Sequence, residues 1–342
     1  MWATGANDFG QLGIYSAWYL RMTKFVVISS GAQDVAAGGG HTMVLKQDGS
    51  VWSAGINIYG QLGDWSNINR DTLVQVIPSY AKAVAAGISH SLVVMQDGSV
   101  WATGFNKFGQ LGDGSKTTRS EFLQVIPTGA TAVAAGGCYS MILKQDGSVW
   151  VTGENEYGLL GFGFAPAGNV FTLVMPDGAR TIAAGFDHIL VLKQDNSVWA
   201  TGKNEFGQLG DGTLRRRTTF VQVVLSGARA VAAGRDHSIV LQRNGVVLIA
   251  GRNNYGQLGL GLQKLQNFFV QVISDGVQAI AAGDWHSMVL KHDGSLWATG
   301  ANMHGQLGDG SVIVKNIFVR LPLQDTGIYG VRCCRDSGFR FA

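Results

Sequence analysis

The stretch DGSVWATGFNKFGQLGDGS, residues 97–115, decides the fold because close copies of it recur along the chain. Its Trp-Ala-Thr-Gly segment begins at Trp101, and the counterparts follow one another at steps of 49 or 50 residues. They begin at Trp2, Trp52, Trp150, Trp199, Leu248 and Trp297. A fixed period of this length indicates an array of small structural units rather than an irregular globular core.

A second phrase, Ala-Ala-Gly-x-x-His-Ser, precedes the tryptophan phrase within each unit. Six clear copies begin at Ala36, Ala85, Ala134, Ala183, Ala232 and Ala281. A worn seventh copy aligns with Gly330–Ser337, where Cys333 and Cys334 replace small residues and Ser337 replaces the histidine. The chain therefore begins with the later half of a unit and ends with the earlier half, and we expect the two halves to combine.

The sequence of each unit predicts four short strands. In the second unit they cover residues 83–87, 90–95, 100–103 and 122–127, and Asp97-Gly98 supplies the tight turn of a hairpin. Such a sheet cannot bury both faces alone, so the units must pack against one another. We therefore predict an all-β, seven-bladed β-propeller spanning residues 1–342 as a single domain, closed by a composite blade from the N- and C-termini. Glycine would let the loop adopt φ values that other residues resist, and the rings of Trp101 and Phe108 would fill space between neighbouring blades.

The composition excludes several classes of protein. Apolar residues make up 46% of the 342 residues and charged residues 14%, which excludes a disordered chain. A net charge of +3 is too small to indicate nucleic-acid binding. The three cysteines make no disulfide framework, which favours a reducing compartment. No apolar run reaches the ~18 residues of a membrane span, and no secretory signal is evident, so we expect a cytoplasmic or nuclear protein.

The two phrases and their spacing resemble the repeats of the RCC1 (regulator of chromosome condensation) family over essentially the whole chain. The resemblance implies a seven-bladed propeller closed by a composite blade. It does not choose a function, because the family includes Ran exchange factors, chromatin binders, ubiquitin-ligase modules, a plant photoreceptor and a β-lactamase inhibitor. The photoreceptor branch clusters tryptophans as Gly-Trp-Arg-His-Thr, and only Gly283–Ser287 comes near that motif.

Recurring polar residues have structural explanations. The histidines at one repeat position, with Tyr139 in the third copy, could suggest a metal site, but equivalent residues on sheets ~10 Å apart cannot share an ion. We expect buried imidazoles hydrogen-bonded to neighbouring backbone. The Asp-Gly pairs are turns, and no nucleophile with a base and an orienting group is evident. We therefore expect no catalytic residues, no metal and no cofactor. The histidines are His41, His90, His188, His237 and His286.

Positions that vary while the pattern repeats are the candidates for partner binding. The pair between Ala-Ala-Gly and the histidine should surround the mouth of the central channel, where aromatic residues and arginine make good interface anchors. This predicted rim comprises Phe186, Asp187, Arg235, Asp236, Asp284 and Trp285. The alternative interpretation is an unconstrained solvated loop.

A second variable set flanks the recurring asparagine of the glycine-rich loop. Ile56, Ile58, Phe105 and Lys107 would form a second binding face on neighbouring blades, if exposed. Arg215-Arg216-Arg217 is more typical of a solvated loop than of a phosphate contact.

These observations predict a non-enzymatic scaffold that binds a protein partner through one face of the propeller. The alternative is guanine nucleotide exchange on a Ran-like small GTPase. By family analogy exchange would need a wedge-like insertion in one blade, and the regular 49-residue step leaves little room for one. The chain also lacks a basic arm to hold DNA.

Overall fold

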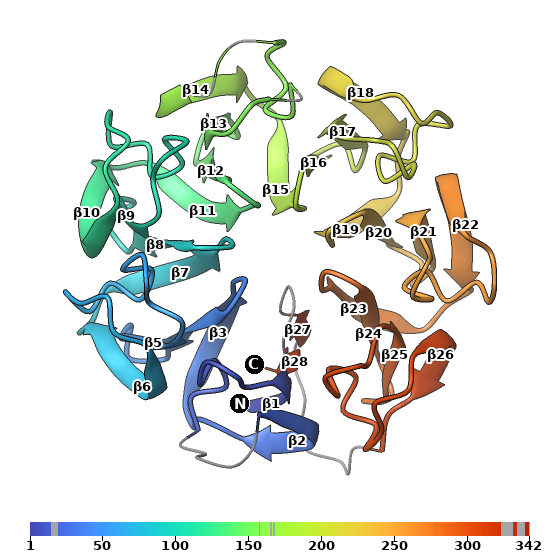
Figure 1. Ribbon diagram of the computed structural model, residues 1–342. Coiled ribbons are helices and arrows are strands. Elements are labelled where there is room, and N and C mark those ends of the chain that lie inside the picture. Colours follow the sequence, from blue (N-terminus) through green and yellow to red (C-terminus); the bar gives the residue numbers. More distant parts are fainter. Residues whose placement is uncertain are drawn as a thin grey trace.

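The chain folds into seven four-stranded antiparallel sheets arranged around a central axis (Figure 1). The computed structural model describes residues 1–14, 20–156, 158–164, 166, 168–322, 331–333 and 339–341. Within this part of the chain every regular element is a strand. The predicted all-β, seven-bladed propeller is confirmed.

In blades 1 to 6, numbered in chain order, the first strand lies innermost and each strand pairs with the next. Blades 1 to 3 consist of β3 (Ala32–Ala37), β4 (His41–Lys46), β5 (Val51–Gly55), β6 (Arg70–Ile77); β7 (Ala81–Ala86), β8 (His90–Met95), β9 (Val100–Gly104), β10 (Arg119–Ile126); and β11 (Ala130–Ala135), β12 (Tyr139–Lys144), β13 (Val149–Gly153), β14 (Gly168–Met175). Blades 4 to 6 consist of β15 (Ala179–Ala184), β16 (His188–Lys193), β17 (Val198–Gly202), β18 (Arg217–Val224); β19 (Ala228–Ala233), β20 (His237–Gln242), β21 (Val247–Arg252), β22 (Leu265–Ile273); and β23 (Val277–Ala282), β24 (His286–Lys291), β25 (Leu296–Gly300), β26 (Lys315–Arg320).

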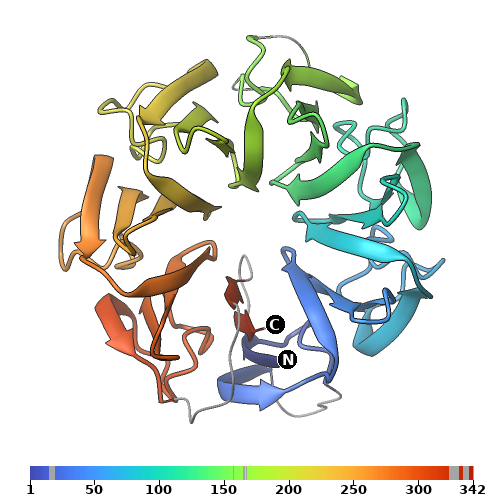
Figure 2. The same ribbon diagram turned by 180° about the vertical axis from the view of Figure 1, so that it is seen from behind.

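The two ends of the chain form the seventh, composite blade, whose strand order is β2-β1-β28-β27. β1 (Trp2–Ala6) and β2 (Arg21–Val27) supply its outer half, and β27 (Val331–Cys333) and β28 (Phe339–Phe341) supply its inner half. Both termini therefore lie in one sheet (Figure 2), which confirms the predicted closure. Residues 330 and 334–337 of the worn copy, Cys334 and Ser337 among them, lie outside the described residues.

Local sequence explains the hairpin inside each blade. The turn that joins β8 to β9 places Gly98 at a φ of +80°, which glycine adopts without strain. The backbone N–H of Ser99 donates to the Asp97 carboxylate at 2.8 Å, and the Trp101 indole N–H donates to the Ser99 hydroxyl at 3.1 Å. The Asp-Gly-Ser-x-Trp sequence thus fixes both the turn and the direction of the tryptophan ring.

Glycine at the end of the Gly-Gln-Leu-Gly phrase lets the next blade approach closely. A Cβ atom at Gly112 would lie 2.4 Å from the ring of Phe171, which belongs to the outer strand of blade 3. The same contact recurs at five further blade junctions: Gly63–Phe122, Gly161–Phe220, Gly210–Phe269, Gly259–Phe318 and Gly308–Phe25. The ring that fills this space is therefore on β14 and its equivalents. The prediction for Phe108 was wrong, since its side chain is 37% exposed.

The recurring histidines connect neighbouring blades. In four blades the histidine Nε2 lies 2.8–3.0 Å from a serine hydroxyl of the next blade. Each serine hydroxyl in turn donates to a glutamine carbonyl of the histidine's own blade, at 2.6–2.7 Å. The pairs are His41–Ser91, His90–Ser140, His188–Ser238 and His237–Ser287.

A hydroxyl has one hydrogen, so a serine that donates to a carbonyl must accept from the histidine. These rings therefore carry a proton on Nε2. The imidazoles are buried as predicted, but this partner is a side chain of the adjacent blade rather than backbone. The prediction of a backbone partner was wrong because the sequence does not show which blade surfaces face each other.

Candidate binding face at the channel mouth

Both variable sets of residues lie at the same end of the blades. The loop from the innermost to the second strand of each blade carries the first set, and the segment after the third strand carries the second. A backbone hydrogen bond joins them in blade after blade, as from Lys203 N to Asp187 O at 2.8 Å. Equivalent bonds join Ile56 to Gly40, Phe105 to Ser89, Glu154 to Cys138, Arg252 to Asp236 and Ala301 to Trp285. The two sets form one surface, which we name the channel-mouth face.

The recurring asparagine builds the loop that carries the second set. In blade 2 the buried Asn106 accepts a hydrogen bond from Leu111 N at 3.0 Å. Its amide group donates to the Asp113 carboxylate at 3.0 Å and to the carbonyl oxygen of Thr117 at 3.1 Å. The side chain thus satisfies backbone groups on both sides of the loop, which lets an irregular segment be buried.

In five of the described loops, the residue two positions after the asparagine places an aromatic ring on the channel-mouth face. Phe108 occupies this position in blade 2, where its backbone N–H donates to Gln110 at 3.1 Å. The equivalent aromatic residues in other blades are Phe9, Tyr59, Phe206 and Tyr255. We call these five residues the aromatic belt. The sequence shows them at a constant position in the repeat, but their role was not recognised because repetition alone does not separate surface residues from core residues.

An ion pair closes the same loop in four blades. Asp113 contacts Arg119 at 2.9 Å, and the pairs Asp64–Arg70, Asp211–Arg217 and Asp309–Lys315 are equivalent. Arg217, the last residue of the triple arginine, is therefore part of the loop structure. Arg216 stacks on the ring of Phe164 at 4.9 Å.

The composite blade and blades 1 and 2 give the channel-mouth face an apolar sector. The ring of Phe105 lies 4.8 Å from that of Tyr59 and 6.2 Å from that of Phe108. The side chain of Ile58 is 52% exposed, and Phe9 is 46% exposed. Lys107 is exposed next to Phe108, and Ile56 is half-buried. We define this apolar sector as Phe9, Ile56, Ile58, Tyr59, Phe105 and Phe108.

Blades 4 to 6 carry an alternation of rings and guanidinium groups. The Arg235 guanidinium lies 4.1 Å from the ring of Phe186 and 5.1 Å from that of Trp285. Arg252 likewise lies 4.5 Å from the ring of Phe206 and 5.1 Å from that of Trp285. Cation–π contacts of this kind restrict the arginine side chains before any partner arrives.

Acidic side chains lie beneath the two arginines. Asp284 contacts Arg235 at 3.9 Å, and Asp236 contacts Arg252 at 3.4 Å. Burial raises the pKa of Asp236, although the charges of Arg252, Lys203 and Arg235 oppose the shift. The side chain of Asp284 is 3% exposed and that of Arg235 is 35% exposed, so the positive end of the Arg235–Asp284 pair points outward.

Blades 3 and 4 form an acidic sector of the same face. Burial raises the pKa of Glu154, and repulsion from Asp187 and Glu156 adds to the shift. Lys203 lies 4.0 Å from Asp187 and 3.5 Å from Glu205. We define the acidic sector as Glu154, Glu156, Asp187 and Glu205.

A cavity of about 290 Å³ opens at the channel mouth between the sectors. Phe9, Ile56 and Ile88 form an apolar wall, and Phe186, Arg235 and Asp284 lie opposite. The structure thus brings Ile56 of the second predicted set together with three residues of the predicted rim. Gly39 and Gly40 of blade 1 also line the cavity.

Comparison with known proteins agrees with this architecture. A sequence profile described as the RCC1-like domain matches residues 1–334. The chain belongs to the RCC1-like domain family. A search of curated proteins gives no match to this RCC1-like chain.

Two solved structures resemble this RCC1-like propeller over nearly the whole chain. Human WBSCR16 is 20% identical with a TM-score of 0.88, and the match covers 100% of this chain and 98% of that one. Prp20p from Saccharomyces cerevisiae is 21% identical with a TM-score of 0.89, covering 99% of this chain and 90% of that one. The work on the Prp20p structure also describes its binding properties to Gsp1p and histones. At these identities the likeness shows the fold of the RCC1-like chain.

In the described part of the RCC1-like chain, no helix is long and apolar enough to cross a membrane.

Proposed function

We propose that this RCC1-like chain, as one propeller domain of the cytoplasm or nucleus, is a non-enzymatic scaffold that binds a protein partner through the channel-mouth face. Arg235 carries the proposal, because two rings from neighbouring blades hold it at the edge of a cavity. Arginine and aromatic residues in a restricted arrangement are typical of interface hot spots. One fold can carry many different functions, so the proposal is argued from the residues of this site and not from the propeller fold.

The apolar sector supports the same proposal. Its exposed rings and Ile58 lie on adjoining blades, and exposed apolar groups that are contiguous mark interaction sites. Together with the cavity and the arginines, this sector gives one face both a contiguous apolar area and charged groups beside it, a combination found in protein interfaces.

Capture of partners from a lysate of the source organism tests the proposal. Wild-type protein is compared with Arg235→Gln and Trp285→Ala on the channel-mouth face and with Arg229→Gln on the inner strand β19. We expect both variants of the face to lose captured proteins that Arg229→Gln retains. Retention of every captured protein by correctly folded Arg235→Gln and Trp285→Ala would refute the assignment of the face.

The alternative function is guanine nucleotide exchange on a Ran-like small GTPase. The observation in its favour is the similarity of the fold to Prp20p, which is described as binding Gsp1p. Faster release of labelled GDP from a captured GTPase, in the presence of catalytic amounts of this chain, would support exchange and exclude a role as scaffold alone.

A further inference from the structure

We infer that the partner contributes a loop or tail in which one large apolar side chain is followed by lysine or arginine. This inference rests on the proposed function and concerns the chemistry of the partner. The apolar side chain fills the cavity at the channel mouth, and the basic residues lie on the acidic sector.

The size and walls of the cavity define the first part of the ligand. A volume of about 290 Å³ lies at the lower limit of small-molecule pockets, about 300 Å³, and accommodates one or two side chains rather than a folded element. Phe9, Ile56 and Ile88 offer apolar contact on one side. Burial of a leucine or phenylalanine side chain against them provides the main stabilisation.

Arg235 defines how the backbone of the segment lies. In the described part of the chain its guanidinium donates no hydrogen bond, because the nearest carboxylate oxygen, of Asp284, is 3.9 Å away. The contact of Arg235 with the Phe186 ring at 4.1 Å nevertheless restricts the arginine side chain. Backbone carbonyl oxygens beside the inserted side chain can accept hydrogen bonds from the solvent-facing N–H groups of Arg235, at the outward, positive end of this pair.

Charge defines the residues that follow. Asp187 is the next residue after Phe186, so the acidic sector begins at the wall of the cavity. The raised pKa of Glu154 reflects burial and also repulsion from Asp187 and Glu156, and a cation would offset the repulsion. A net charge of +3 for the whole chain contrasts with the described residues of the two variable sets, among which acids outnumber bases. The acids are Asp8, Glu154, Glu156, Asp187, Glu205, Asp236 and Asp284, and the bases are Lys107, Lys203, Arg235 and Arg252.

Fluorescence anisotropy with labelled peptides tests the inference. The probe is a short Gly-Ser peptide with Leu-Lys-Lys at its centre, and the comparison peptides carry Ala-Lys-Lys or Leu-Glu-Glu. We expect replacement of the leucine by alanine to weaken binding about tenfold, from lost apolar burial. The Leu-Glu-Glu peptide should bind more weakly still at low salt.

Variants of the protein separate the two contacts. Ile88→Gln should reduce the preference for leucine over alanine. Glu154→Gln combined with Asp187→Asn should weaken binding of the Leu-Lys-Lys peptide about fivefold at low salt, and less at high salt, since surface charge pairs are screened. Asp177→Asn with Asp275→Asn is the matched control, because both carboxylates are exposed in loops that precede the inner strands, at the other end of the blades.

Three outcomes overturn the inference: no binding of the Leu-Lys-Lys peptide, equal binding of the Leu-Glu-Glu peptide, or unchanged affinity in both folded face variants. The capture experiment uses no assumption about peptide chemistry. If capture depends on Arg235 and Trp285 while the peptide result is negative, the proposed function stands and this inference fails.

Discussion

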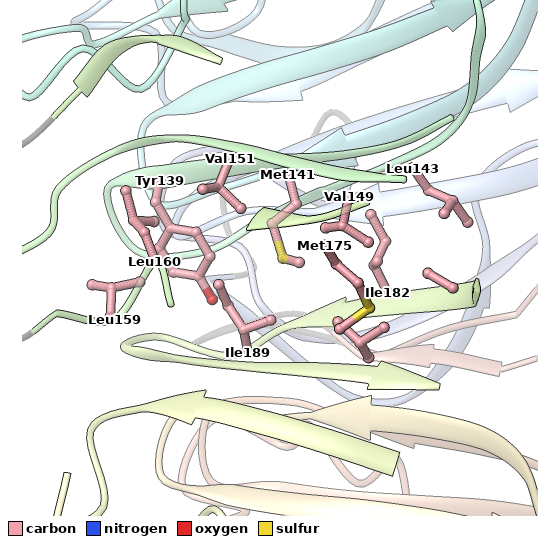
Figure 3. Packing of buried hydrophobic residues seen from close by; sticks show 12 residues of the cluster. Tyr139, Met141, Leu143, Val149, Val151, Leu159, Leu160, Met175, Ile182 and Ile189 are labelled. Carbon is pink, nitrogen blue, oxygen red and sulfur yellow. The ribbon is translucent and has the colours of Figure 1, made fainter. Parts of the chain in front are cut away.

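Tyr139 and Ile189 occupy, in blades 3 and 4, the positions that hold a histidine and a serine at four other blade junctions. The Tyr139 hydroxyl reaches past the serine position and donates to the carbonyl oxygen of His188 at 2.7 Å, and the carbonyl oxygen of Gly185, at 3.0 Å, is a second acceptor within reach. Tyr139 and Ile189 belong to one buried cluster (Figure 3). The apolar side chain fits here because the longer ring no longer needs a hydroxyl as its acceptor.

A double-mutant cycle tests this exchange of partners. Tyr139→His alone places a buried Nε2–H against Ile189, and we expect a loss of about 1–3 kcal/mol in the free energy of unfolding. Ile189→Ser alone leaves a cavity and removes apolar contacts. The double variant rebuilds the His–Ser pair, so the coupling energy from urea unfolding should be favourable by about 1 kcal/mol. Additive effects of the two changes would contradict the pairing.

The buried histidines make stability depend on pH. Burial lowers the pKa of His237 to about 3, with help from His188 and His286, and lowers that of His286 to about 4. An unfolded histidine titrates near pH 6.5, so below that pH the unfolded state takes up protons that the folded state refuses. Stability is therefore fully present above pH 6.5 and falls as the pH drops toward 4.

The expected loss between pH 7 and pH 5 is about 2 kcal/mol for each such ring, measured from urea midpoints at both values. The comparison is His237→Gln, which cannot take up a proton and should show a smaller difference between the two pH values. Identical pH dependence in the wild type and the variant would show that protonation of His237 does not control this window.

We expect the recurring asparagine to stabilise the loop that carries part of the channel-mouth face. Asn106→Ala removes the acceptor for Leu111 N and the donors to Asp113 and Thr117, all within a buried loop. We expect a loss of about 2–4 kcal/mol in the free energy of unfolding, as for several buried groups left unsatisfied. Asn254→Ala changes the same residue type at an exposed position of the face and should cost less than about 0.5 kcal/mol. Thermal unfolding of both variants provides the measurement.

The sequence predicts the blades well because each strand is determined within its own repeat. The strand residues 90–95 and the turn at Asp97-Gly98 depend on neighbours along the chain, and the structure places β8 at the same bounds. The expected closure of the ring by the two half-units is confirmed by the pairing of β1 with β28.

Contacts between blades were harder to predict because they join residues about one repeat apart. The serine partner of His237, the Phe171 ring over Gly112 and the approach of Arg252 to Trp285 depend on how two sheets face each other. Each of these residues is visible in the repeat, but a single repeat does not contain its partner. The two variable sets were predicted as separate faces for a different reason. The backbone bond from Lys203 to Asp187 lies within one blade, but it joins segments on either side of a hairpin that are not adjacent in the sequence.

Substitution of two glycines in one loop distinguishes the cost of backbone strain from the cost of disturbed packing between blades. Gly112 and Gly114 have φ values of +75° and +80°, so alanine is strained at both. At Gly112 the new Cβ would also lie 2.4 Å from the Phe171 ring, whereas at Gly114 nothing lies within 4 Å. We expect Gly114→Ala to cost about 1 kcal/mol and Gly112→Ala about 2–4 kcal/mol, because Phe171 must move and separate the blades. Phe171→Leu should relieve part of the second cost, and equal losses for the two glycine variants in urea unfolding would refute the role of Gly112 at the blade junction.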